Sequence, residues 1–208
     1  MTMTSAPPPP PHPPVTRRRP ALLTTLVVTL VLALAGGGFV AWRTLNGGDD
    51  EPLAGRPRVE DRAAGLSYAV PEGWQRGDGD LIDSFTSSVT REHPGGRGGS
   101  IVAAGRGDGV PRAQLGAATE RWARSNAVFF HPDGRSTVTE SEATTVGGRP
   151  AHTVTLKVAD GENGTGHLRM TVVAVDDDRV AFLLAVVQPA TGAEKRTADL
   201  VLSSAALL

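Results

Sequence analysis

The sequence predicts an α+β domain built on an antiparallel β-sheet, preceded by a single N-terminal transmembrane helix. Three observations lead to this prediction. Residues 21–42 are apolar and contain no charged residue. Several segments after residue 63 alternate apolar and polar residues and are separated by short turns, which is typical of antiparallel strands. Two further segments repeat apolar residues at helical spacing and would cover the faces of the sheet.

Composition divides the chain into four parts. Residues 1–20 form a proline-rich tail, 21–42 the transmembrane helix, 43–62 a flexible linker and 63–208 the outer domain. Proline-rich sequence favours an extended polyproline II conformation and cannot bury a core. The linker mixes glycine, proline and charges. The outer domain is long enough to bury a core, and the absence of cysteine excludes disulfides, thiolate metal sites and cysteine nucleophiles.

The apolar segment has the length and flanks of a membrane span. Its 22 residues would extend roughly 33 Å as a helix, against a bilayer core of about 30 Å. Trp42 lies at the end of the segment, where interfacial aromatics are favoured. Arg17, Arg18 and Arg19 precede it, and such flanks remain cytoplasmic. We therefore expect a cytoplasmic N-terminus and an extracytoplasmic C-terminal domain.

The main alternative is an export signal that is removed. Ala33-Leu34-Ala35 has the A-x-A pattern of a signal-peptidase site, and the arginines before it would form the charged region of a signal or of a twin-arginine signal. The apolar run continues to Trp42, however, which favours an uncleaved anchor. Gly36–Gly38 lack G-x-x-x-G spacing, so we interpret them as a flexible helix end rather than a helix-dimer contact.

The first elements of the outer domain are three strands and a helix. The strands are expected at Leu66–Val70, Leu81–Thr90 and Ser100–Ala104. Pro111 occupies a position favoured at the first turn of a helix. We expect this helix to fade near Asn126, before Pro132. Its apolar stripe would consist of Leu115, Ala118, Trp122 and Ala123.

Four strands and a closing helix follow. The expected strands are Ser136–Val146, Ala151–Ala159, His167–Val175 and Arg179–Val187. The last is almost wholly apolar, which predicts a central strand covered on both faces. The closing helix begins near Thr191, because Thr191 and Glu194 have capping-box spacing. Its apolar side would consist of Leu200, Val201 and Leu202.

Several local patterns make the outer domain resemble the PsbP-like fold, which includes a photosystem extrinsic protein and the LpqN-type envelope proteins of actinobacteria. The patterns are Gly65-Leu66-Ser67 leading into Val70-Pro71-Glu72-Gly73-Trp74, the mid-chain helix, Val146-Gly147-Gly148-Arg149-Pro150-Ala151, the apolar strand at 179–187 and the closing helix. The resemblance covers about residues 63–208. It implies a binding or accessory role and no active-site residue.

No recognisable chemical site emerges from the residues. The domain's histidines are His93, His131, His152 and His167, and they lack metal-ligand spacing. There is no G-x-S-x-G elbow, and the glycine-rich runs lack the lysine of a phosphate loop. Asp78-Gly79-Asp80 and Asp176–Asp178 fit solvated turns better than calcium sites. We assign no catalytic, cofactor-binding or metal-ligating residue and no cofactor.

Charge and topology narrow the function classes. All 22 acidic residues follow the membrane segment, so the outer domain is mildly acidic and nucleic-acid binding is disfavoured. Abundant alanine, glycine and arginine suggest an actinobacterial source. The favoured hypothesis is a membrane-anchored, non-enzymatic accessory or binding domain of the bacterial cell envelope with an envelope or protein partner. The alternatives are a signalling or assembly protein whose proline-rich tail binds a cytoplasmic partner, and an extracytoplasmic hydrolase with an unrecognised site.

Overall fold

The structure, a computed structural model, describes residues 52–77, 84–93, 98–161 and 164–208. These residues belong to one folded unit, Pro52–Leu208. The expected tail (1–20), the transmembrane helix (21–42) and the first part of the linker lie outside the described residues. Within the described ranges, no helix has the length and apolar character needed to cross a membrane.

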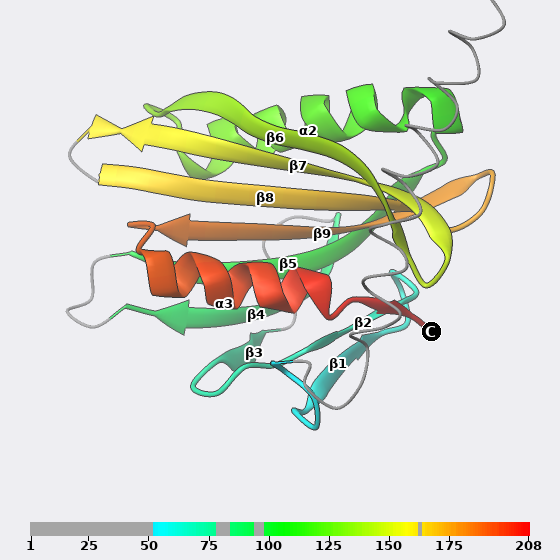
Figure 1. The fold of residues 1–208 in the computed structure, drawn as a ribbon, viewed down its shortest axis with the longest axis horizontal. Helices are drawn as coiled ribbons and strands as arrows, with labels where there is room; N and C mark the ends of the chain where they lie inside the picture. The colour runs from blue at the N-terminus through cyan, green and yellow to red at the C-terminus, as the bar shows by residue number, and fades with distance from the viewer. Residues whose placement is uncertain (1–51, 78–83, 94–97, 162–163) are drawn as a thin grey trace, which may run out of the picture. The chain divides into compact units, whose positions relative to one another are not determined.

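A seven-stranded antiparallel sheet forms the centre of the domain (Figure 1). The spatial order is β3-β4-β5-β9-β8-β7-β6. The strands are β3 (Gln75–Gly77), β4 (Phe85–Glu92), β5 (Gly99–Asp108), β6 (Arg135–Val146), β7 (Arg149–Asp160), β8 (Gly164–Ala174) and β9 (Arg179–Gln188). This confirms the predicted α+β class and its antiparallel sheet.

Strand β9 lies at the middle of the sheet and is buried on both faces, as its apolar sequence predicts. Val180, Phe182, Leu184 and Val186 face one hydrophobic core. Ala181, Leu183, Ala185 and Val187 face another. Because successive side chains of a strand point to opposite faces, one continuous apolar run contributes to two cores.

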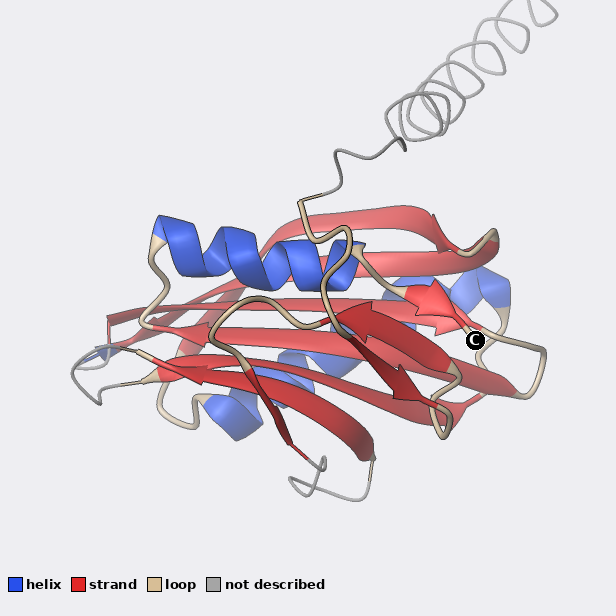
Figure 2. Cartoon of the chain, turned by 90° about the horizontal axis from the view of Figure 1, so that it is seen from below, coloured by secondary structure: helices blue, strands red, loops and turns tan. Residues whose placement is uncertain are grey.

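Two helices cover opposite faces of the sheet (Figure 2). Helix α2 (Leu115–Phe130) follows a short 3-10 helix, η1 (Arg112–Gln114), and packs on β6, β7 and β8. Helix α3 (Gly192–Ser203) packs on the other side over β5 and β9. Thr191 is its N-cap and accepts a hydrogen bond from the Glu194 backbone N–H, which confirms the predicted start.

A second, three-stranded sheet was not expected from the sequence. It has the order β1-β2-β10, formed by β1 (Arg58–Asp61), β2 (Leu66–Ala69) and β10 (Ala206–Leu207). Strand β1 lies within the predicted linker 43–62, so the linker boundary and the domain start at 63 are wrong. The domain extends back to Pro52 because these residues make specific tertiary contacts.

Buried polar contacts hold the small sheet to the large one. Asp61 is buried and accepts hydrogen bonds from the backbone N–H of Ala64 and from the hydroxyls of Thr86 and Ser87, at 2.9, 2.5 and 2.6 Å. The Tyr68 hydroxyl lies 2.9 Å from the Ser87 hydroxyl, and burial raises the pKa of Tyr68 to about 12. A buried carboxylate with several donors is stable only while those donors stay in place.

Two elements are longer than predicted. Helix α2 continues past Asn126 to Phe130, because Ala127 is buried in the core beneath it. Strand β5 continues past Ala104 through two glycines to Asp108. At Gly105 a Cβ would lie 2.4 Å from the Phe182 ring and 2.0 Å from the Ser84 carbonyl oxygen, so glycine is required by packing rather than by a turn.

Arg58 provides a test of the corrected domain boundary. Its guanidinium donates to the carbonyl oxygens of Ser204, at the end of α3, and Ser67, at 2.7 and 3.0 Å. We expect Arg58→Ala to lower the free energy of unfolding by about 2 kcal/mol, the order expected for charge-assisted hydrogen bonds in a partly buried site. Urea denaturation of residues 52–208 would measure this. Arg62→Ala, at an exposed neighbouring position, is the control. Equal stabilities of the two variants would contradict a structural role for β1.

Candidate functional site

Three of the four described histidines pair with a carboxylate. His93 Nε2 lies 3.4 Å from Glu194, His131 Nδ1 lies 3.1 Å from Asp160, and His167 Nε2 lies 3.0 Å from Asp199. Within the described ranges, no group of three potential ligand side chains could hold a metal ion.

Two histidines contact a serine hydroxyl, but neither contact has the geometry of a hydrolase triad. His93 Nε2 lies 3.0 Å from Ser100 Oγ and uses the same nitrogen toward Glu194. In a triad the carboxylate binds the opposite ring nitrogen. His152 Nε2 lies 3.0 Å from Ser141 Oγ, and the described residues include no carboxylate hydrogen-bonded to its other nitrogen. These pairs are therefore better explained as structural hydrogen bonds.

The concentration of polar side chains lies instead on the outer strands of the large sheet, on the α3 side. Arg169 pairs with Ala185, whose side chain belongs to the α3-side core, so Arg169 points to the same face. Thr155 and Thr153 pair with Arg169 and Thr171, and Lys157 pairs with His167. We name this surface the polar face. It consists of Glu140 and Glu142 on β6, Thr153, Thr155 and Lys157 on β7, His167, Arg169 and Thr171 on β8, and Asp199 on α3.

A β-bulge in β6 creates the acidic side of the polar face. Val138 pairs with Leu156 and Glu140 pairs with Thr155, so Thr139 is an extra residue between them. The extra residue shifts the alternation by one position. Val138 therefore packs against the α2-side core, whereas Glu140 and Glu142 both point to the opposite side.

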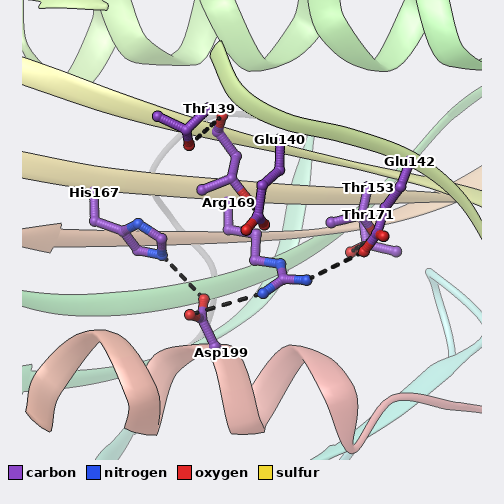
Figure 3. Close-up of polar contacts among 9 residues, drawn as sticks. Thr139, Glu140, Glu142, Thr153, His167, Arg169, Thr171 and Asp199 are labelled. Atoms are coloured by element: carbon purple, nitrogen blue, oxygen red, sulfur yellow. Dashed lines mark hydrogen bonds and ion pairs between the residues drawn. The ribbon is translucent and has the colours of Figure 1, made fainter. Parts of the chain in front are cut away.

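Arg169 lies at the centre of this arrangement (Figure 3). Its guanidinium Nη2 lies 3.7 Å from Glu142 and its Nη1 lies 3.8 Å from Asp199. Both distances exceed those of hydrogen bonds, so its N–H donors can still turn toward a bound acceptor. The Asp199 carboxylate also lies 3.0 Å from His167 Nε2. It is therefore held between two basic side chains, Arg169 and His167.

The threonines form the floor of the polar face. Thr153 and Thr171 are buried and their hydroxyls are 2.9 Å apart. The Thr155 hydroxyl donates to Glu140 at 3.1 Å, and the bulged Thr139 donates to the Thr155 carbonyl oxygen at 3.2 Å. These contacts fix the strand backbone beneath the charged groups. Helix α3 packs mainly on β5 and β9 and does not cover β6 and β7 on this face (Figure 1).

No pattern in the sequence predicts the polar face. Its residues come from four elements between positions 140 and 199 and meet only through strand pairing and the bulge. The other acidic candidates behave as expected or fall outside the description. Asp176 is exposed at a turn, where its hydrogen bonds with Arg179 lower the pKa of its carboxyl. Asp78-Gly79-Asp80 lies outside the described residues.

Comparison with known proteins identifies the fold. No protein-family model matches the chain, and no curated protein matches it. Cyanobacterial PsbP (CyanoP) from Synechocystis is similar in structure, with 17% identity, a TM-score of 0.53, and coverage of 73% of this chain and 92% of that chain. The domain has a PsbP-like fold. LpqN of Mycobacterium tuberculosis, described as involved in cell envelope biogenesis, is also similar, with 14% identity, a TM-score of 0.51, and coverage of 68% and 82%.

The resemblance expected from the sequence is thus confirmed for the PsbP-like domain. At these identities the comparison establishes the fold alone.

His152 should make the stability of the PsbP-like domain depend on pH. Burial lowers the pKa of His152, against the opposing effect of Glu142 and Glu120. The unfolded chain therefore binds the proton more tightly, so this contribution is present above the ordinary histidine pKa of about 6.5 and is lost as the pH falls below it. When the pH is lowered from about 8 to about 5, we expect the free energy of unfolding to fall less in His152→Gln than in the wild type. Urea denaturation at both pH values would show this, and an unchanged pH dependence would contradict it.

The ion pairs of Arg169 on the polar face should contribute little to stability. Because the ion pairs of Arg169 are long and partly exposed, we expect Arg169→Met to change the free energy of unfolding by less than about 1 kcal/mol. Leu168→Ala, a fully buried neighbour on the same strand, should cost about 2–5 kcal/mol. Denaturant titration would compare them. A loss of several kcal/mol in Arg169→Met would make the cluster a structural element instead.

Proposed function

We propose that the chain is a single-pass membrane protein of the bacterial cell envelope that holds its PsbP-like domain outside the membrane as a non-catalytic accessory or binding domain. The uncharged segment 21–42 and the arginines before it support the anchor and its orientation. The description of LpqN as involved in cell envelope biogenesis supports the envelope assignment. The abundance of alanine, glycine and arginine, which suggests an actinobacterial source, agrees with the envelope assignment.

The polar face carries the proposal of a binding role. It presents donors (Arg169 and Lys157) beside carboxylates (Glu140, Glu142 and Asp199), and its threonine floor fixes their positions. Surfaces of mixed charge favour specific partners and exclude wrong ones more than they add raw affinity. The partner would therefore be polar and would itself carry charges of both signs, as a segment of another envelope protein does.

The absence of a hydrolase arrangement at the two serine–histidine contacts of the described residues supports a non-catalytic role. Arg169 would act by binding. Its planar guanidinium can donate two parallel hydrogen bonds to one carboxylate when its present ion pairs loosen.

The proposal can be tested with the cysteine-free chain, into which single cysteines can be introduced. In intact cells, we expect a membrane-impermeant maleimide to label Lys157→Cys on the polar face. The same reagent should label Thr4→Cys in the tail only after lysis, because the N-terminus is cytoplasmic. Labelling of Thr4→Cys in intact cells, or protection of Lys157→Cys that persists in the Arg169→Met background, would contradict the proposed topology.

A benzophenone maleimide on Thr137→Cys tests the binding role, because Thr137 is exposed, pairs with Lys157 across the strands and leaves both donors in place. We expect a discrete cross-linked adduct that is lost in the Arg169→Met background. An exposed α3 position, Arg196→Cys, is the control and should not give the same adduct. An adduct that persists without Arg169, or no adduct at position 137, would argue against binding at the polar face.

A further inference from the structure

Helix α2 carries apolar side chains that its own core does not use. Val128 is 64% exposed and Phe129 is 54% exposed, and they are neighbours in the last turn of the helix. Phe130 packs partly against the core and meets the Phe129 ring edge to face, with centroids 5.0 Å apart. Trp122 is also only partly buried and lies seven residues before Phe129, at helical spacing. We name these four residues the α2 patch.

Basic side chains accompany the α2 patch on the same helix. Arg121 and Arg124 are exposed, and Arg124 is held by Glu120 at 2.9 Å. Among the described residues, Arg121 makes no ion pair. A helix surface that combines Trp, Phe and Val with arginine has the composition of helices that lie in the membrane interface.

The length of chain before the domain favours the bilayer as the occupant. Nine residues, 43–51, separate the predicted span from the folded unit, and they reach at most about 30 Å. The domain is therefore held beside the membrane at a high effective concentration, so even a weak contact would form. Leu53 packs on the α3 side, so the connection must also pass the thickness of the domain, about 20 Å between the outer layers. Nine residues can cover this distance at roughly two-thirds of their full extension.

We propose that the α2 patch rests on the outer surface of the bilayer in which residues 21–42 are anchored. This inference rests on the proposed membrane anchor. With α2 on the lipid, the polar face lies on the opposite side of the sheet and is directed away from the membrane, toward a partner. The connection of residues 43–51 is long enough to allow this orientation and too short to allow large excursions.

The test uses the full chain in vesicles of phosphatidylethanolamine and phosphatidylglycerol. A nitroxide label is placed at Ser125→Cys, an exposed position between Trp122 and Val128 that keeps all four residues of the α2 patch, or at Arg196→Cys on α3 as control. We expect the label at 125 to be more accessible to oxygen than to a water-soluble nickel complex. The label at 196 should show the reverse.

Two further variants make the test specific. Adding Val128→Asp and Phe129→Asp to Ser125→Cys should move its label into water, with an unchanged circular dichroism spectrum. Deleting residues 45–50 should do the same, because the remaining connection cannot span the domain.

Three results would overturn the inference. A label at 125 that is in water although the protein floats with the vesicles would reject the lipid contact and leave the anchor intact. Dipolar broadening between labels on two copies, without lipid contact, would assign the α2 patch to a second copy of the chain. Protein that does not float with the vesicles would reject both the anchor and the lipid contact.

Discussion

The structure depends on burying strand β9 on both faces. Its sequence is apolar at nearly every position, so half of its side chains would face water if only one side of the sheet were covered. Each fully buried Val, Leu or Phe contributes roughly 1.5–3 kcal/mol, which makes this strand a large part of the driving force for folding. The side chains of β9 differ in size on the two faces of the sheet. Phe182 and Leu184 face the α2-side core, whereas Ala181 and Ala185 face α3 and the small sheet and leave room for them to approach.

Strands β6 to β8, on the outer side of the sheet, are covered by a helix mainly on one side, and the polar face lies on their other side. On strands β6 to β8 the large apolar side chains lie mostly toward α2, where Val154, Leu156 and Leu168 are fully buried. Their other side carries threonines, several of them buried, together with arginine and glutamate. The bulge at Thr139 extends this division into the edge strand by turning Glu140 and Glu142 to the polar side. The polar face and the α2 patch therefore lie on opposite sides of the domain, where one can bind a partner while the other contacts the bilayer.

Much of the fold was readable from the sequence, and the failures have physical causes. The long strands, the two-sided burial of β9 and the capping box at Thr191 all follow from local periodicity or spacing. The antiparallel pairing of β7 with β8 agrees with the short turn expected between their two segments. Strands β1, β3 and β10 were missed because elements of two to four residues are too short to show a period. Strand β5 was cut short at Gly105, whose role is to admit the Phe182 ring.

The polar face was missed for another reason. Arg169, Glu142 and Asp199 are distant in sequence, and each alone resembles an ordinary surface charge. Only the register of three strands and one extra residue in β6 brings them together. A one-residue error in that register would place the same side chains on opposite faces.

Native-state hydrogen exchange would test the central claim most directly, because it measures the opening free energy of each strand. If burial of β9 on both faces sustains the fold, its amides and those of its neighbours β5 and β8 should exchange only through global unfolding. Protection should then decrease through β7 to the edge strand β6. Protection of β6 equal to that of β9, or exchange of β9 through local openings, would contradict this account.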